Sequence, residues 1–126
     1  LTKYYPAPDT TVIRDMKEGT FIVYKRSDLR GLQGISLGVG SNDKNNQYSG
    51  GRFEVRLDHP KGKLLGEVVV APSQPSSRMV VTEVNIPLSI ENQDGKWHDI
   101  YIVAKNDRFP SMAVAALDWV RFELQH

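Results

Sequence analysis

Residues 50–66 constrain the fold more than any other part of this sequence. Phe53, Val55 and Leu57 alternate with charged residues, and a period of two is typical of a strand with one side against a core. Residues 60–62 read Pro-Lys-Gly, a combination that favours a reversal of the chain. Residues 64–70 are rich in leucine and valine and return as a second strand. We therefore expect a β-hairpin whose first strand carries a charged side that the core does not explain.

Short segments rich in β-forming residues recur along the rest of the chain, separated by turns that contain glycine or proline. Residues 1–11 hold Pro6 and Pro8, and we expect them to form an irregular entry. Together with the absence of a sustained helical stripe, the pattern predicts an all-β sandwich or barrel. The further strands are expected near residues 20–24, 34–40, 79–88, 97–104 and 117–124.

The composition excludes several classes of protein. The chain has 126 residues, of which 40% are hydrophobic and 25% charged, as is ordinary for one globular domain. A net charge of +1 provides no field that would attract nucleic acid or an anionic membrane, and no apolar run is long enough to cross a bilayer. The absence of cysteine excludes disulfides, zinc thiolates and a cysteine nucleophile.

Catalytic and metal-binding patterns receive little support from the residues. The three histidines lack the spacing of metal ligands, and there is no Gly-x-Ser-x-Gly nucleophile motif. A glycosidase needs two carboxylates about 5–10 Å apart in a substrate cleft. Acidic residues at this density are common on any solvated sheet, so a small hydrolase is the least favoured reading. The acids on expected strands are Glu54, Glu67, Glu83 and Asp99.

Four segments in order resemble the family 6 carbohydrate-binding modules. Residues 50–66 resemble the central hairpin of that family, and residues 17–25 resemble its Gly-Asp-aromatic strand. Residues 98–103 and 117–123 resemble its His-Asp-aliphatic-Tyr and Leu-Asp-Trp strands. The resemblance implies a non-catalytic β-sandwich of the jelly-roll type that binds polysaccharide. It also places loop and strand at residues 111–120, where alanine and methionine would favour a short helix on propensity alone.

The resemblance implies a first possible sugar site at the loop-rimmed edge of the sandwich. Sugar recognition there depends on aromatic rings that stack on the pyranose face. This sequence departs from that pattern, because neither of the two aromatic positions holds an aromatic residue and the amide position holds an alanine. The residues at these positions are Asp15, Arg78 and Ala116. The edge site is therefore expected to be degenerate or remade, with Tyr48, Phe109 or Trp97 as possible substitutes and Asp15 and Arg78 as a possible polar pair.

A second possible site lies on the concave face of one sheet, where the resemblance implies that some members of the family bind glycan. The resemblance places an aromatic at Phe21 and a carboxylate at Glu54 there, with Arg56 as a basic neighbour. The alternative is that Phe21 belongs to the core and that Glu54 only pairs with Arg52 or Arg56. Alternation along residues 21–24 does not decide which side of that strand is buried.

The resemblance also implies a structural calcium ion. Asp118 matches the carboxylate that the family supplies from its closing strand. The usual Glu-Ala-Glu signature of the first strand is missing, and calcium prefers six or more oxygen ligands. Calcium therefore stays an open expectation. Phe53, Val55, Leu57 and Trp119 are expected to be buried.

The preferred hypothesis is one domain, residues 1–126, excised from a larger exported protein that is secreted, on the cell surface or periplasmic. It would bind carbohydrate and hold an appended catalytic domain close to its substrate, with no nucleic-acid or membrane partner. The alternative hypothesis is a structural or protein-interaction module that kept the sandwich and lost the sugar site.

Overall fold

A computed structural model describes residues 2–6, 16–41, 48–72, 80–90 and 96–124, with strand β1 and Ser41 described by their backbone only. Apart from turns and bends, these residues form strands, and none of them belongs to a helix that could cross a membrane. The prediction of an all-β protein is confirmed. The strands are β1 Thr2–Pro6, β2 Phe21–Asp28, β3 Leu32–Ser41, β4 Gly51–Leu57, β5 Lys63–Val70, β6 Val80–Pro87, β7 Trp97–Lys105 and β8 Ala116–Leu124.

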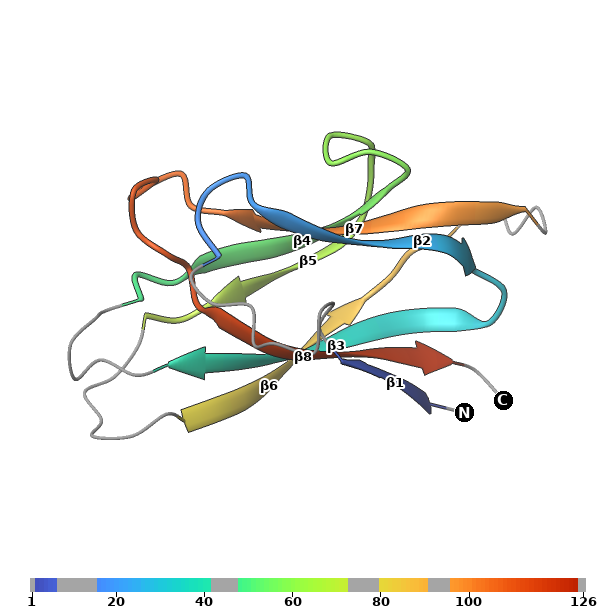
Figure 1. Ribbon diagram of the computed structural model, residues 1–126, viewed down its shortest axis with the longest axis horizontal. Coiled ribbons are helices and arrows are strands. Elements are labelled where there is room, and N and C mark those ends of the chain that lie inside the picture. Colours follow the sequence, from blue (N-terminus) through green and yellow to red (C-terminus); the bar gives the residue numbers. More distant parts are fainter. Residues whose placement is uncertain (1, 7–15, 42–47, 73–79, 91–95, 125–126) are drawn as a thin grey trace.

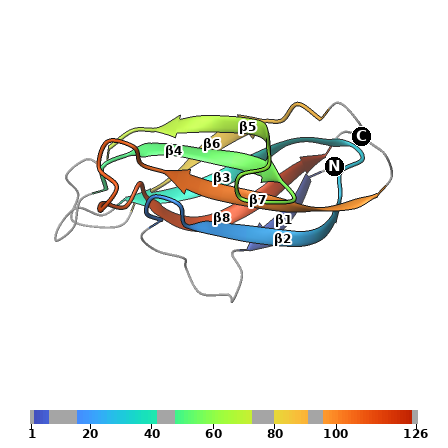
Figure 2. The same cartoon turned by 90° about the horizontal axis from the view of Figure 1, so that it is seen from above.

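The strands form two antiparallel sheets packed face to face (Figure 1). Sheet I has the order β1-β8-β3-β6, and sheet II has the order β2-β7-β4-β5. Seen from above, sheet II covers sheet I along most of its length (Figure 2). The last strand, β8, lies between the first and third strands, so the chain crosses repeatedly between sheets as in a jelly roll.

The core is built by the alternation that the sequence predicts. Phe53 and Val55 have no exposed surface, and Leu57 is partly buried against the same cluster. From sheet I, Ile35 and Leu37 meet them with their side chains fully buried. Because alternate residues point to opposite faces, the charged residues of β4 must lie on the outer face of sheet II.

The prediction that Trp119 is buried in the core is wrong, and a β-bulge is the reason. Trp119 pairs with Gly38 and Leu117 pairs with Val39, so Asp118 is an extra residue on β8. The bulge reverses the alternation and turns Trp119 to the outer face of sheet I. There its indole ring occupies the space above Gly38, where a Cβ atom would lie 2.2 Å from Nε1.

The expected irregular entry over residues 1–11 is also wrong in part. Residues 2–6 form β1, which pairs with β8 at the edge of sheet I. Pro6 does not prevent this pairing, because a proline is tolerated on an edge strand. The prediction of loop followed by strand over 111–120 is confirmed, because β8 begins at Ala116.

The glycine pair before β4 is required by both backbone geometry and space. Gly50 has φ of 75°, and a Cβ atom there would lie 2.5 Å from the carbonyl oxygen of Val70. Gly19 offers a matched comparison, since its φ is 80° and a Cβ atom would meet nothing within 4 Å. The backbone angle is nearly the same at the two positions, whereas the steric conflict is present only at the buried Gly50.

Gly50→Ala is therefore expected to destabilise the protein more than Gly19→Ala does. Left-handed backbone costs an alanine about 1–2 kcal/mol at either position, and the clash adds at least about 1 kcal/mol at Gly50. Urea unfolding of both variants measures the difference. Equal losses of unfolding free energy would show that the contact between Gly50 and Val70 has no energetic weight.

Candidate functional site

Strand register places an aromatic ring and a charged cluster in one row on the outer face of sheet II. Phe21 lies opposite Val103, Val103 lies opposite Glu54, and Glu54 lies opposite Glu67. Directly opposed residues of antiparallel strands share a face, so all four side chains point away from the core. Phe21 is 44% exposed and meets Tyr101 edge-to-face with a centroid separation of 5.1 Å.

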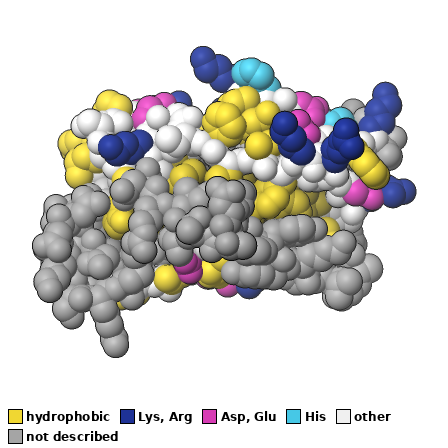
Figure 3. Space-filling model, in the orientation of Figure 1, with side chains coloured by type: hydrophobic (Ala, Val, Ile, Leu, Met, Phe, Trp, Pro, Cys, Tyr) yellow, Lys and Arg dark blue, Asp and Glu magenta, His cyan; other side chains and the backbone are white. Residues whose placement is uncertain are grey.

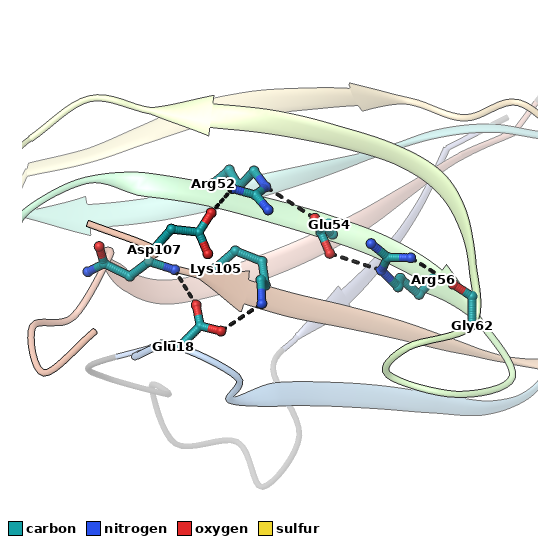
Figure 4. A network of polar contacts seen from close by, with 8 residues as sticks. Glu18, Arg52, Glu54, Arg56, Gly62, Lys105 and Asp107 are labelled. Atoms are coloured by element: carbon teal, nitrogen blue, oxygen red, sulfur yellow. Dashed lines mark hydrogen bonds and ion pairs between the residues drawn. The ribbon is translucent and has the colours of Figure 1, made fainter. Parts of the chain in front are cut away.

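Glu54 is held between two arginines on its own strand (Figure 4). Its Oε2 accepts a hydrogen bond from Nε of Arg52 at 3.1 Å, and its Oε1 accepts one from Nε of Arg56 at 2.9 Å. The residue is only 3% exposed. Burial raises the pKa of Glu54, but the hydrogen bonds from Arg56 and Arg52 outweigh it, so the pKa lies below the ordinary value of a glutamate.

Two further ion pairs join the loops at one end of sheet II to its surface (Figure 4). Lys105 Nζ donates to Glu18 Oε2 at 2.6 Å, and Arg52 Nη1 donates to Asp107 Oδ2 at 2.7 Å. The backbone N–H of Asn106 donates to the other oxygen of Glu18 at 2.6 Å. The hydrogen bonds from Lys105 and Asn106 lower the pKa of Glu18, and the bond from Arg52 lowers the pKa of Asp107.

The loop between β4 and β5 rises above sheet II and turns over β7 (Figures 1 and 2). Arg56 Nη1 donates to the carbonyl oxygen of Gly62 at 2.8 Å, which ties the end of this loop to Glu54. The loop is tied to β7 as well, because Asp58 N–H donates to the Asp99 carbonyl at 2.7 Å and Asp58 Oδ2 lies 2.9 Å from His98 Nδ1. The loop thus forms a fixed wall beside the charged row.

Between this wall and the ion pairs lies an open hollow with a volume of about 330 Å³. Its floor is formed by Val103 of β7 and by the three charged residues of β4, Arg52, Glu54 and Arg56. Figure 3 shows basic and acidic side chains along the layer that carries sheet II, with hydrophobic side chains between them. A ligand in this hollow would meet charged hydrogen-bonding groups beside an exposed ring. The lining residues are Gly19, Arg52, Glu54, Arg56, Pro60, Lys61, Val103, Lys105 and Asp107.

The structure brings together three of the residues expected in a site. Phe21, Glu54 and Arg56 lie on the same face, and the proposal that Phe21 belongs to the core is wrong because the ring is exposed. The other half of that alternative is confirmed, since Glu54 pairs with both arginines. Asp15 and Arg78 lie outside the described residues.

The aromatic substitutes suggested for the edge site differ in accessibility. Tyr48 is 6% exposed and packs against Ala116, so its ring does not offer a free stacking surface. Phe109 is 44% exposed in the loop after β7, with the guanidinium of Arg108 5.3 Å from its centroid. Trp97 is 65% exposed at the opposite end of β7.

Several residues of the face were missed by sequence reasoning. Tyr101 and Lys105 alternate with buried Ile100, Ile102 and Ala104 on β7, and this alternation was a usable signal. Lys61 lies in a turn, and no local pattern in the sequence places it beside Val103 of β7. The partners Glu18 and Asp107 are brought in from distant loops, which a period of two does not reveal.

Asp118 lies at the bulge of β8 and is partly exposed. Within the described part of the chain, no three histidine, cysteine, aspartate or glutamate side chains come together as metal ligands. One carboxylate falls far short of the six or more oxygens that calcium prefers. Among the described residues, a calcium ion at Asp118 would therefore need most of its oxygen ligands from carbonyl or amide groups rather than from a cluster of carboxylates.

Comparison with known proteins identifies the family. The sequence profile of the family 6 carbohydrate-binding modules matches residues 2–124. The chain belongs to this family of non-catalytic modules, which bind carbohydrate. Comparison with curated protein sequences gave no match.

Solved structures share the fold. A β-1,3-glucan-binding family 6 module from Bacillus halodurans is 24% identical with a TM-score of 0.68, over 97% of this chain and 85% of that one. A family 43 arabinoxylan arabinofuranohydrolase from Bacillus subtilis, solved with cellotetraose, is 20% identical with a TM-score of 0.69, over 99% of this chain and 24% of that one. A family 36 carbohydrate-binding module solved with calcium and xylotriose is 13% identical with a TM-score of 0.51, over 98% and 88%.

Glu54→Gln is expected to destabilise the protein by about 2–3 kcal/mol. The amide keeps the shape of the side chain but removes the counter-charge of Arg56 and leaves Arg52 with Asp107 alone. The cost should lie below that of breaking a fully buried pair. Glu67→Gln is the control, because Glu67 lies directly opposite on β5 and is exposed. It should change the unfolding free energy by less than about 0.5 kcal/mol.

The loss should also depend on pH. Since the pKa of Glu54 is lower in the folded state, its contribution is complete above the pKa of the unfolded state and disappears as pH falls through the folded value. The gap between wild type and Glu54→Gln in denaturant unfolding should therefore be full at neutral pH and close as pH falls below the ordinary pKa of a glutamate, about 4.3. A gap that stays constant as the pH falls would mean that the ion pairs do not stabilise the fold.

Proposed function

We propose that the outer face of sheet II is the carbohydrate-binding surface of this module. The observation that carries the proposal is the position of Phe21, an exposed ring in the same row as the charged cluster of Glu54. A pyranose has an apolar face of C–H groups and a rim of hydroxyls. An aromatic ring beside charged hydrogen-bonding groups is complementary to both.

Within this proposal the residues have different roles. Phe21, supported edge-on by Tyr101, stacks on the sugar ring. Arg56 on β4 and Lys105 at the end of β7 donate hydrogen bonds to the hydroxyl groups of the sugar in the hollow. Glu54 was expected to contact sugar directly, but both of its oxygens already accept from arginines, so we assign it the role of orienting them.

The edge of the sandwich supports the proposal less well. Ala116 is buried, and Tyr48 packs against it with 6% of its surface exposed. Phe109 remains as the accessible ring among the described loop residues near that end. If neither Phe21 nor Phe109 contributes to binding, the alternative of a structural or protein-interaction module becomes the better one.

We also propose that residues 1–126 form one module of a larger exported protein and direct an appended enzyme to polysaccharide. Support comes from the arabinofuranohydrolase, of which the matching region is 24% of the chain. Secretion and the presence of an appended enzyme are proposed by analogy with this protein and with other members of the family.

Phe21→Ala is expected to weaken glycan binding ten-fold or more. Loss of a stacking ring typically costs about 1–3 kcal/mol, by analogy with stacking on nucleic-acid bases. Because the ring is 44% exposed, the variant should stay folded. The ligand is first chosen on a glycan array, and isothermal titration then gives the affinity.

Phe109→Ala is the matched control, because Phe109 is exposed to the same extent but lies in the loop after β7. It should bind as the wild type does. Loss of binding in Phe109→Ala with normal binding in Phe21→Ala would place the site at the edge. Release of reducing ends from the polysaccharide would contradict a purely binding function.

Calcium at Asp118 stays a prediction that rests on the family resemblance and on the calcium-containing family 36 structure. If a site forms, calcium binds the folded state and raises the melting temperature by linkage, and Asp118→Ala removes the increment. Thermal melting in calcium and in EDTA checks this. Identical wild-type curves in the two conditions would contradict the prediction.

A further inference from the structure

The hollow on sheet II offers hydrogen-bond donors in excess of acceptors. Four of its nine lining residues are cations and two are carboxylates. Both oxygens of Glu54 are taken by Arg52 and Arg56, and one oxygen of Asp107 is taken by Arg52. Most carboxylate oxygens of the hollow therefore already accept hydrogen bonds from the protein.

Donors remain on the cations after these contacts. Arg56 uses Nε and Nη1 for Glu54 and Gly62, and Lys61 is an exposed residue on the wall. In the described part of the chain, neither Nη2 of Arg56 nor Nζ of Lys61 has a protein partner. Arginine has five N–H donors and no acceptor, and lysine has three and none. A sugar hydroxyl can donate or accept a hydrogen bond, whereas these cations only donate. The hollow therefore favours a ligand group that only accepts hydrogen bonds.

The geometry points to a glycan that carries a uronic acid. This inference rests on the proposed function and names the class of its ligand. Phe21 and Glu54 lie on β2 and β4, which are separated by β7 and therefore lie roughly 10 Å apart. A glycan with one ring stacked on Phe21 can thus direct the C5 carboxylate of a neighbouring residue into the hollow. A planar carboxylate matches the guanidinium edge of Arg56, and a charge-assisted hydrogen bond is about twice as strong as a neutral one.

The fixed wall makes the arrangement more selective. Pro60 and Lys61 stand over the floor on the loop that Arg56 and Asp58 hold in place. The guanidinium of Arg56 is therefore already positioned before a ligand arrives, so little of its side-chain entropy is lost on binding. Arg56 is also held by Glu54, which keeps its guanidinium in the hollow while neutralising only part of its donor capacity.

The test compares acidic polysaccharides with carboxyl-reduced forms of the same polymers. Polygalacturonate, alginate and glucuronoxylan are each used before and after reduction, so that linkage is held constant and only the carboxylate is lost. Affinity electrophoresis should show at least ten-fold tighter binding to one of the acidic forms at low salt. The preference should shrink as salt is raised, because the hollow is open to solvent and its charges are screened.

Lys61→Ala should weaken binding to the acidic form several-fold and leave binding to the reduced form unchanged. Lys63→Ala removes the same charge two residues away, outside the hollow, and should have no effect. If Lys61→Ala keeps the full preference for the acidic form over the reduced form, the inference that the uronate carboxylate binds beside the β4–β5 loop is wrong.

The other outcomes separate this inference from the proposed function. Equal binding to acidic and reduced forms, with Phe21→Ala defective on both, would overturn the inference and leave the proposed function standing. Preference for a sulfated polymer such as carrageenan over every uronate would also overturn it. Failure to bind any acidic or neutral polymer would contradict both.

Discussion

The pairing of one nearly buried carboxylate with two arginines organises the functional side of this protein. Glu54 fixes Arg52 and Arg56 on the middle of sheet II. Arg56 then holds the β4–β5 loop through Gly62, and Arg52 holds the loop after β7 through Asp107. The shape of the hollow between these loops therefore depends on ion pairs and hydrogen bonds of the outer face, and not on the packing of the hydrophobic core.

The same face shows why a buried polar cluster can suit a binding module. A fully apolar surface of this size would promote aggregation. A surface with buried charges that lack partners of opposite charge would destabilise the fold. Here the carboxylate neutralises two guanidinium groups enough to keep them close together, and the remaining donors stay available at the surface. Stability and recognition therefore draw on the same residues.

The sequence predicts the parts of this structure that depend on local alternation. The inward side of β4 follows directly from Phe53, Val55 and Leu57, and the family resemblance supplies the outward position of Phe21. The same reasoning fails at the β-bulge of Asp118. The inserted residue turns Trp119 to the outer face, and the residue types around it do not indicate the insertion. Long-range pairs such as Glu18 with Lys105 depend on strand order, which alternation does not encode.

Strand order also bears on how the protein is made. Glu18 and Lys105 are 87 residues apart, as are Ser36 and Glu123 across sheet I, and β8 lies between β1 and β3. A nascent chain that has not yet released its last strand lacks the centre of one sheet and leaves the edges of β1 and β3 unpaired. Such edges template pairing with other chains. The module therefore passes through synthesis with its most aggregation-prone surfaces open until almost the whole chain has emerged.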